Sequence, residues 1–335
     1  MGTACHTSSP VIQEEKLKLP ELDLPVRRVI VLAGPTATGK SYLGLKIAKL
    51  LGGEIISADS MQVYRGMDLG TAKVSAMEQE GIPHHLIDIR HITEPFNVVD
   101  FCLEAESAIH SILARGRVPI IVGGSGFYLR SLLCGAPKGP PTDPLVRRQL
   151  EGELERKGSD LLYYRLQQLD PTYAKTITMH DKHKIVRGLE IIALSHQHVT
   201  DFKQEGPYSS EYDFRCWFLH RPRASLYQRI NNRCETMLEH GLIDEVIALE
   251  KEGLRQNSSA VQAIGYRQTL EYLATPQTHP DYDRFVEALK AASRHYAKRQ
   301  FTWFKKEPLF RWVDLDLLDP ETVWDMIITN YQTLS

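Results

Sequence analysis

The sequence feature that most constrains the fold is a phosphate-binding loop near the N-terminus. Residues 34–41 read GPTATGKS and fit the pattern G-x-x-x-x-G-K-S/T. A β-branched run, RRVIVLAG, precedes the loop, and an apolar helical pattern follows it as far as Gly52. In such a loop backbone N–H groups face an anion, the helix N-terminus adds its dipole, and Lys40 adds a full charge. The loop therefore predicts a polyphosphate site, in which the Ser41 hydroxyl can ligate Mg²⁺.

The first part of the chain alternates strand and helix patterns. Short β-branched runs at 54–59, 83–89 and 118–124 are interrupted by a stretch at 98–115 in which apolar residues follow helical spacing. This alternation predicts an α/β fold with a P-loop NTPase-like parallel sheet as its core.

A proline- and glycine-rich stretch, CGAPKGPPTDP, ends this alternation at 134–144. Residues 145–198 are charged and helical in pattern, and strand character returns at 211–222 before further helices. We therefore divide the chain into a disordered tail (1–26), a first core part (27–138), an inserted helical subdomain (139–205), a second core part with C-terminal helices (206–316) and a C-terminal tail (317–335).

Composition narrows the classes of protein further. The chain has 335 residues, 42% hydrophobic, and a formal net charge of −2, so any nucleic-acid role needs local basic patches. The five cysteines are scattered without a C-x-x-C pair, which argues against a zinc site or a disulfide framework. No apolar run approaches the roughly 20 residues that span a membrane. We expect a cytoplasmic monomer with no membrane partner.

A polar string, ISADSMQVYRGMDLGTAK, follows the second predicted strand. It begins at the carboxyl end of a parallel strand, where α/β proteins bind ligands. Asp59 can orient an amine or take a proton from it, and Ser60 and Gln62 can hydrogen-bond a base edge. The alternative for Asp59 is a helix cap or an ordinary loop acid. Two cations of the string are either phosphate ligands or solvated surface charges: Arg65 and Lys73.

Motor and switch nucleotide hydrolases are disfavoured. Such enzymes place an aspartate at the end of a second strand to hold the metal, whereas the strand at 118–124 ends in glycines before Ser125. The chain also lacks an N-K-x-D motif for reading guanine. A kinase of a small substrate remains open.

Six blocks occur in order between about residues 29 and 306: GPTATGKS, ISADSMQVYRGMDLGTAK, GIPHHLID, VGGSGFYLRSLL, AIGYRQ and AKRQFTWF. Together they resemble the tRNA dimethylallyltransferase family, also called tRNA isopentenyltransferases or IPP transferases. The resemblance implies transfer of a dimethylallyl group from dimethylallyl diphosphate to N6 of the adenosine 3′ of the tRNA anticodon. The products would be N6-isopentenyladenosine and diphosphate, the cofactor Mg²⁺, and the partner a tRNA anticodon stem-loop clasped by the insertion.

The resemblance also assigns roles near the reacting atoms. Asp59 matches the general base, Lys40 would stabilise charge on the departing diphosphate, and Ser41 would ligate Mg²⁺. Ser125 stands where the family usually has threonine, and its hydroxyl would contact the adenosine or its phosphate. The whole loop would hold the diphosphate: Gly34, Pro35, Thr36, Ala37, Thr38, Gly39, Lys40 and Ser41.

Several blocks match tRNA-contacting segments of the family. Because the target adenine must be unstacked to reach Asp59, we expect base flipping. Gln262 stands where some relatives have arginine, and for the arginines and Tyr266 the alternative is a surface or packing role. The residues expected to contact tRNA are Asp59, Ser60, Met61, Gln62, Ser125, Arg147, His183, Lys184, Ile185, Val186, Arg187, Gln262, Ala263, Ile264, Gly265, Tyr266 and Arg267.

A basic and aromatic segment, RHYAKRQFTWFKK at 294–306, suits RNA backbone contact and base stacking, although part of its aromatic face must be core. Three other functions stay open at this point. The chain could prenylate free AMP or ADP, phosphorylate a small substrate, or bind RNA without catalysis.

Overall fold

A computed structural model describes residues 27–202 and 211–333, and its core is one parallel sheet. The strands are β1 (Arg28–Ala33), β2 (Glu54–Ala58), β3 (His84–His85), β4 (Pro119–Gly123), β5 (Asp213–His220) and β6 (Arg311–Asp314). Their order is β3-β2-β4-β1-β5-β6, and every pairing is parallel. The predicted α/β class is confirmed. The predicted disordered tail at 1–26 and the expected end of the insertion at 205 lie outside the described residues.

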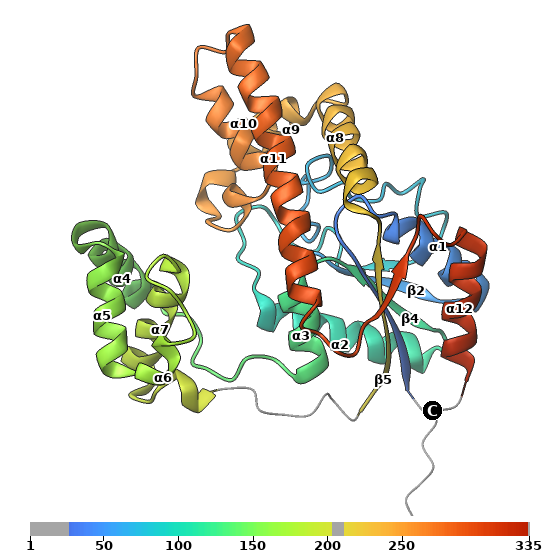
Figure 1. Cartoon of the computed structure of the whole chain (residues 1–335), viewed down its shortest axis with the longest axis horizontal. Coiled ribbons are helices and arrows are strands. Elements are labelled where there is room, and N and C mark those ends of the chain that lie inside the picture. Colours follow the sequence, from blue (N-terminus) through green and yellow to red (C-terminus); the bar gives the residue numbers. More distant parts are fainter. Residues whose placement is uncertain (1–26, 203–210, 334–335) are drawn as a thin grey trace, which may run out of the picture.

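Alternate residues of β1 enter different cores because side chains of a strand point to opposite faces. Ile30 and Leu32 pack with α1 (Lys40–Leu51) and α12 (Pro320–Gln332) on one face. Val29 and Val31 pack on the other face with α2 (Val98–Ala114), α3 (Gly126–Cys134) and α11 (His279–Phe304). Figure 1 shows the sheet between these two helical layers.

A second group of helices stands over the carboxyl edge of the sheet. It contains α8 (Arg223–Glu239), α9 (Leu242–Lys251), α10 (Tyr266–Leu273) and the N-terminal half of α11, with two short 3₁₀ turns at Leu254–Gln256 and Ala260–Gln262. These helices rise above the strand ends in Figure 1. They cover the edge at which the phosphate loop and the polar string emerge.

The inserted segment forms a separate helical bundle beside the core (Figure 1). Its elements are α4 (Pro144–Lys157), α5 (Ser159–Leu169), α6 (Pro171–Ala174), α7 (Lys182–Ser195) and a 3₁₀ turn at Val199–Phe202. The bundle has its own apolar core, made of Leu150, Leu162, Leu166, Ile177, Ile185, Val186 and Leu189. It is therefore a compact unit joined to the core by the segment that precedes Pro144 and the one that follows Phe202.

The C-terminal segment differs from the tail predicted for 317–335. Residues Pro320–Gln332 form α12, which buries Val323 and Ile327 against the sheet and α1. Asp319 caps this helix by accepting a hydrogen bond from the Thr322 backbone N–H at 2.9 Å. The capping residue and the apolar pair four residues apart are the sequence signals of this helix.

A buried carboxylate secures the opposite, amino edge of the sheet. The Glu54 side chain accepts hydrogen bonds from His85 Nε2 and from one terminal guanidinium nitrogen of Arg115, both at 2.7 Å. Burial by itself raises the pKa of Glu54, but these hydrogen bonds outweigh burial and hold the pKa below its usual range. The charged form of Glu54 therefore stabilises the fold.

We expect Glu54→Gln to lower the free energy of unfolding at pH 7 by about 1–3 kcal/mol, because hydrogen bonds to a charged group are lost. Since the pKa of Glu54 is lowered on folding, its contribution is complete above the unfolded pKa of about 4.3 and disappears as pH falls through the folded value. Urea denaturation at pH 7 and below pH 4 tests this, with Glu104→Gln in the half-exposed Arg90 pair as a control. Equal stability of Glu54→Gln and wild type at pH 7 contradicts it.

Candidate active site

The phosphate loop joins β1 directly to α1. Lys40 is the first residue of α1, and Gly39 precedes it with a left-handed φ of 102°. Ala37 also has a positive φ, 64°, which is uncommon for a residue with a Cβ and marks a constrained backbone. Gly34 lies so close to β5 that an added Cβ would be 2.4 Å from the Leu219 carbonyl oxygen. The loop is thus built tightly into the sheet.

Side chains from α11, from α8 and from the connection between β5 and α8 brace this loop. Gln300 of α11 accepts a hydrogen bond from the Thr36 N–H at 3.1 Å and donates one to the Gly124 carbonyl at 2.9 Å. Arg221 Nε donates to the Thr38 carbonyl at 3.0 Å, and Arg229 Nε donates to the Ala37 carbonyl at 2.8 Å. Both arginines bind carbonyl oxygens of the loop.

Lys40 carries a charge in an unfavourable setting. Its Nζ donates to the Pro35 carbonyl at 3.1 Å. Burial, together with the positive charge of Arg233, lowers the pKa of Lys40 to about 8, and the charge of Asp59 opposes this in part. An anion bound at the loop would relieve this strain on the charged form.

Two cavities meet beside the loop. The phosphate-loop cavity, about 520 Å³, is lined by Gly39, Lys40, Ser41, Arg229 and Arg233 among others. The central cavity, about 290 Å³, contains Asp59 and a set of apolar side chains: Met61, Ile230, Met237, Ile264 and Leu289. Arg233 lines both cavities and therefore marks their junction.

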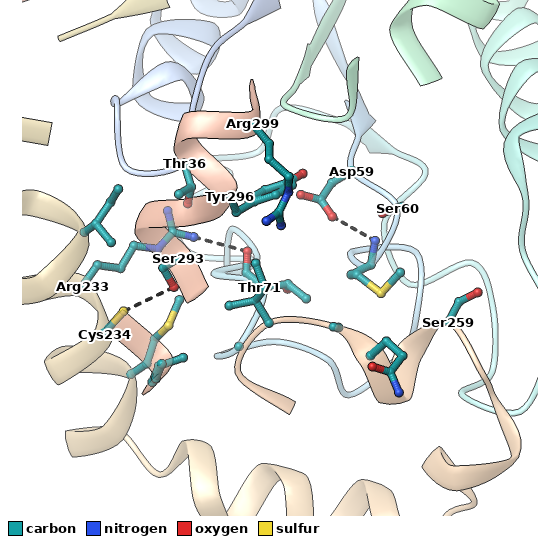
Figure 2. Close-up of a pocket in the computed structure, with 18 residues that line it drawn as sticks. Thr36, Asp59, Ser60, Thr71, Arg233, Cys234, Ser259, Ser293, Tyr296 and Arg299 are labelled. Atoms are coloured by element: carbon teal, nitrogen blue, oxygen red, sulfur yellow. Dashed lines mark hydrogen bonds between the residues drawn. The ribbon is translucent and has the colours of Figure 1, made fainter. Parts of the chain in front are cut away.

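Asp59 is held at the wall of the central cavity. Its Oδ1 accepts a hydrogen bond from the Met61 N–H at 2.9 Å, which fixes the carboxylate in a tight turn after β2. Figure 2 shows Asp59 beside Tyr296 and Arg299 of α11, and all three line the cavity. Sequence-predicted Ser60, Met61, Gln262, Ala263 and Ile264 also line this cavity.

Arg233 is a functional candidate that the sequence analysis missed. One of its terminal guanidinium nitrogens donates to the Thr71 carbonyl at 3.3 Å (Figure 2). Its Nε is buried and has no hydrogen-bond partner among the described residues. An unsatisfied buried donor at the junction of two cavities is suited to a polar ligand. Arg229 and Arg233 stand four residues apart in the sequence, a spacing typical of one helix face, and this spacing was the available signal.

Ser125 does not line the central cavity itself but contacts Tyr296, which does. It sits at the N-terminus of α3, and its hydroxyl hydrogen-bonds Tyr296, which lines the cavity. Burial and the nearby charge of Asp59 raise the pKa of Tyr296. Tyr296 is thus a neutral hydroxyl between Ser125 and Asp59.

Some predicted contacts are corrected by burial or by internal partners. Tyr266 is fully buried and donates to Glu245, and the side chains of Ile185 and Val186 are in the core of the insertion. Helical geometry turns these three side chains inward, away from the protein surface. The Gln62 side chain accepts a hydrogen bond from the Ser57 hydroxyl and donates one to the Thr71 carbonyl, and it does not line the central cavity.

Both uncertain cations of the polar string have internal partners, and Lys73 also lines the phosphate-loop cavity. Lys73 Nζ contacts carboxylate oxygens of Asp68 at 2.6 Å and Asp88 at 2.5 Å, so its charge is neutralised inside the protein. Arg65 Nε donates to the Asp88 carbonyl at 2.9 Å.

The predicted contacts on the insertion lie apart from both cavities. Arg147 and Arg187 bind the fully buried Glu190, through N···O distances of 3.3 and 2.7 Å. Arg187 also donates to the Pro140 carbonyl at 2.6 Å, which ties the entry segment to α7. His183 and Lys184 are exposed on α7.

The predicted basic and aromatic segment at 294–306 forms the C-terminal part of α11, which ends at Phe304, and the two lysines that follow it. Lys298, Arg299, Trp303 and Lys306 line a surface cleft of about 660 Å³ together with Arg130 of α3. Phe304 is buried in the core. The segment is therefore divided between a basic surface and packing.

The residues at the loop fit a magnesium ion. Ser41 provides a hydroxyl oxygen at the start of α1, and Mg²⁺ prefers oxygen ligands. Within the described residues, 27–202 and 211–333, no group of three or more histidine, cysteine or acidic side chains is placed to hold a metal ion. An ion here would share its coordination between Ser41 and phosphate oxygens of a ligand.

None of the described helices is long and apolar enough to cross a membrane.

Sequence comparisons agree with the geometry. A family model described as IPP transferase matches residues 62–307. The chain is 60% identical over 309 residues to a tRNA dimethylallyltransferase of Protochlamydia amoebophila (strain UWE25), covering 92% of this chain and 90% of the relative. It is 47% identical over 307 residues to the protein of the same name from Chlamydia pneumoniae, with 91% and 90% covered.

Two solved structures are also similar. A full-length tRNA isopentenylpyrophosphate transferase from Bacillus halodurans has 38% identity and a TM-score of 0.67, and the match covers 91% of this chain and 96% of that chain. A eukaryotic dimethylallyltransferase acting on tRNA has 29% identity and a TM-score of 0.75, with 90% and 80% covered.

The lowered pKa of Lys40 predicts a pH-dependent affinity for diphosphates. We expect the affinity for an alkyl diphosphate, which is fully ionised above pH 7, to fall about tenfold between pH 7 and 9, because the protonated fraction of Lys40 falls by that factor. Isothermal titration at several pH values measures it. Lys40→Arg, which stays protonated over this range, should lose the dependence, and a flat profile for wild type would show that Lys40 is not the titrating group.

Proposed function

The chain belongs to the IPP transferase family, and on this premise we propose that it transfers a dimethylallyl group from dimethylallyl diphosphate to N6 of the adenosine 3′ of the anticodon in tRNA. The observation that carries the proposal is the pairing of the two cavities. A cationic cavity at the phosphate loop adjoins a partly apolar cavity that contains a carboxylate. A prenyl diphosphate has the same two halves.

The donor fits across the junction of the cavities. The diphosphate would lie on the loop amides with Lys40, Arg229 and Arg233, which offer three positive charges. The branched hydrocarbon would point toward apolar side chains of the central cavity, such as Ile230 and Met237. Arg233 would then sit near the bond that breaks.

The residues divide the chemistry of one substitution. The adenosine N6 lone pair forms a bond to C1 of the allylic group, and the C1–O bond electrons leave with the diphosphate. Lys40, Arg229 and Arg233 stabilise the charge that develops on the leaving oxygen. Asp59 takes the proton that N6 must lose, and the neutral Tyr296 hydroxyl can orient the base or the carboxylate. Mg²⁺, held by Ser41 and the phosphates, would supply further charge neutralisation.

The relatives' names favour tRNA over free AMP or ADP as the acceptor, and prenyl transfer over phosphorylation. The insertion and the basic cleft beside α11 offer surfaces for an anticodon stem-loop. The side chains we propose for it are His183, Lys184, Lys298 and Lys306. We place the reaction in the cytoplasm and propose that the protein acts as a monomer.

Asp59→Asn tests the general base. Asparagine keeps the oxygen that accepts from the Met61 N–H but cannot take a proton, so we expect transfer to fall at least 10²-fold while the Kd for tRNA stays within about twofold. Single-turnover transfer to an unmodified anticodon stem-loop and filter binding measure the two quantities. Transfer near the wild-type rate would exclude Asp59 as the base.

Lys184→Gln tests the insertion as a tRNA contact. Loss of one phosphate contact should weaken tRNA binding and reduce the slope of log K against log salt by about 0.7–0.9. Lys184 is preferable to Arg187, whose loss would leave the buried Glu190 with fewer partners. Lys49→Gln on α1 is the control, because α1 lies on the far side of the sheet from the insertion (Figure 1). An unchanged slope for Lys184→Gln would remove this side chain from the interface.

A further inference from the structure

A carboxylate outside both cavities holds the polar string in place. Glu245 lies on α9, which is not a wall of either cavity. Its Oε2 accepts hydrogen bonds from the backbone N–H groups of Asp68 at 3.2 Å and Leu69 at 2.7 Å. Its Oε1 accepts from the Gly70 N–H at 3.2 Å and from the Tyr266 hydroxyl at 2.6 Å. Each carboxylate oxygen thus receives two donors.

Three successive backbone N–H groups that converge on one anion are a strong local restraint. Because they point to the same side, the string at 68–70 is curled around the carboxylate, and no neutral side chain offers two acceptor oxygens in this position. The next residue is Thr71, whose carbonyl accepts from Arg233. The restraint on 68–70 therefore reaches the guanidinium at the junction of the cavities through one residue.

Tyr266 extends the same restraint to the opposite wall of the central cavity. It is fully buried, and an added Cβ at Gly70 would lie 2.4 Å from its Cε2 atom. Ala263 and Ile264 line the cavity, and only Gly265 separates them from Tyr266 in the sequence. Glu245 thus joins the wall at 70–71 to the wall at 263–264.

We propose that Glu245 is a positioning residue for the transfer reaction: it fixes residues 68–71 so that the Thr71 carbonyl holds Arg233 between the two cavities. The inference rests on the proposed function, because it places Arg233 against the donor diphosphate. Glu245 itself touches neither cavity and acts through the backbone of the string. A guanidinium that is already in position before the reaction begins contributes to the affinity for the diphosphate donor and to the rate of transfer.

Glu245→Gln is the direct test. Glutamine keeps the shape of the side chain, but its NH₂ group is a donor and would face other donors. We expect KM for dimethylallyl diphosphate to rise about tenfold and kcat to fall about tenfold, with KM for the stem-loop changed less. Asp244→Asn, which removes a charge from an exposed neighbour on the same helix, should leave these constants within about twofold of wild type.

Two further variants identify the route. Tyr266→Phe removes one of the four donors but keeps the ring against Gly70, so it should change the donor KM in the same direction by only a few-fold. In an Arg233→Ala background, Glu245→Gln should have at most a twofold effect, because residues in one chain of contacts are not additive. Full additivity of Glu245→Gln and Arg233→Ala would overturn the proposed route.

Hydrogen exchange gives a readout that does not need turnover. Amides within 68–70 should exchange faster in Glu245→Gln, while those of β1 keep their wild-type protection. Unchanged exchange at 68–70, or a loss of kcat in proportion to the folded fraction with an unchanged donor KM, would reduce Glu245 to a stabilising residue and overturn the proposal. Absence of prenyl transfer by the wild-type protein would instead contradict the proposed function. The exchange result would still test whether Glu245 restrains residues 68–70.

Discussion

Concentrated positive charge at the phosphate loop is the interaction on which the rest of the site depends. Lys40, Arg229 and Arg233 line one cavity, and burial together with the charge of Arg233 lowers the pKa of Lys40. Among the described residues that line the central cavity, Asp59 is the one carboxylate. Such an arrangement is stable only because the surrounding carbonyl groups accept from these cations, and it becomes more favourable when a diphosphate is bound.

The fold supplies this arrangement by bringing strand ends to one edge. β1 lies between β4 and β5, so the phosphate loop is flanked by Gly124 on one side and by Arg221 on the other. Helices α8 and α11 then cross above the edge and carry Arg233, Tyr296 and Gln300 to it (Figure 1). The apolar core that also contains α2 and α3 fixes these helices, through buried residues such as Leu226 of α8 and Phe304 of α11. Packing far from the cavities therefore determines where the charges lie.

The sequence predicted the parts of the site that are local in the chain. The phosphate loop has a fixed spacing, and Asp59 follows a strand whose carboxyl end had to meet the loop. Arg233 and Glu245 were missed because their roles depend on contacts with Thr71 and residues 68–70, more than 160 positions away. The four-residue spacing of Arg229 and Arg233 indicates that they share a helix face, but it does not say that this face meets the strand ends.

The errors in the predicted elements have similar physical reasons. The short strand β6 has one fully buried residue, Val313, so it lacks the pattern of a core strand. Asp319, a helix-capping residue, and the apolar Val323 are the sequence features that indicate helix α12, whereas the predicted division of the chain treats this segment as a tail. Tyr266 was expected at the ligand because it stands in a matched block, whereas the block serves partly to hold Glu245. A shared motif therefore identifies a family more securely than it identifies contacts.

The most direct measurement follows label from the prenyl group of dimethylallyl diphosphate in the presence of Mg²⁺. An unmodified anticodon stem-loop with an adenosine 3′ of the anticodon, AMP and ATP are offered in parallel. The account predicts label on the RNA alone, with diphosphate released in equal amount. Label on AMP or ADP, or phosphate transfer from ATP with no prenylated product, would contradict it.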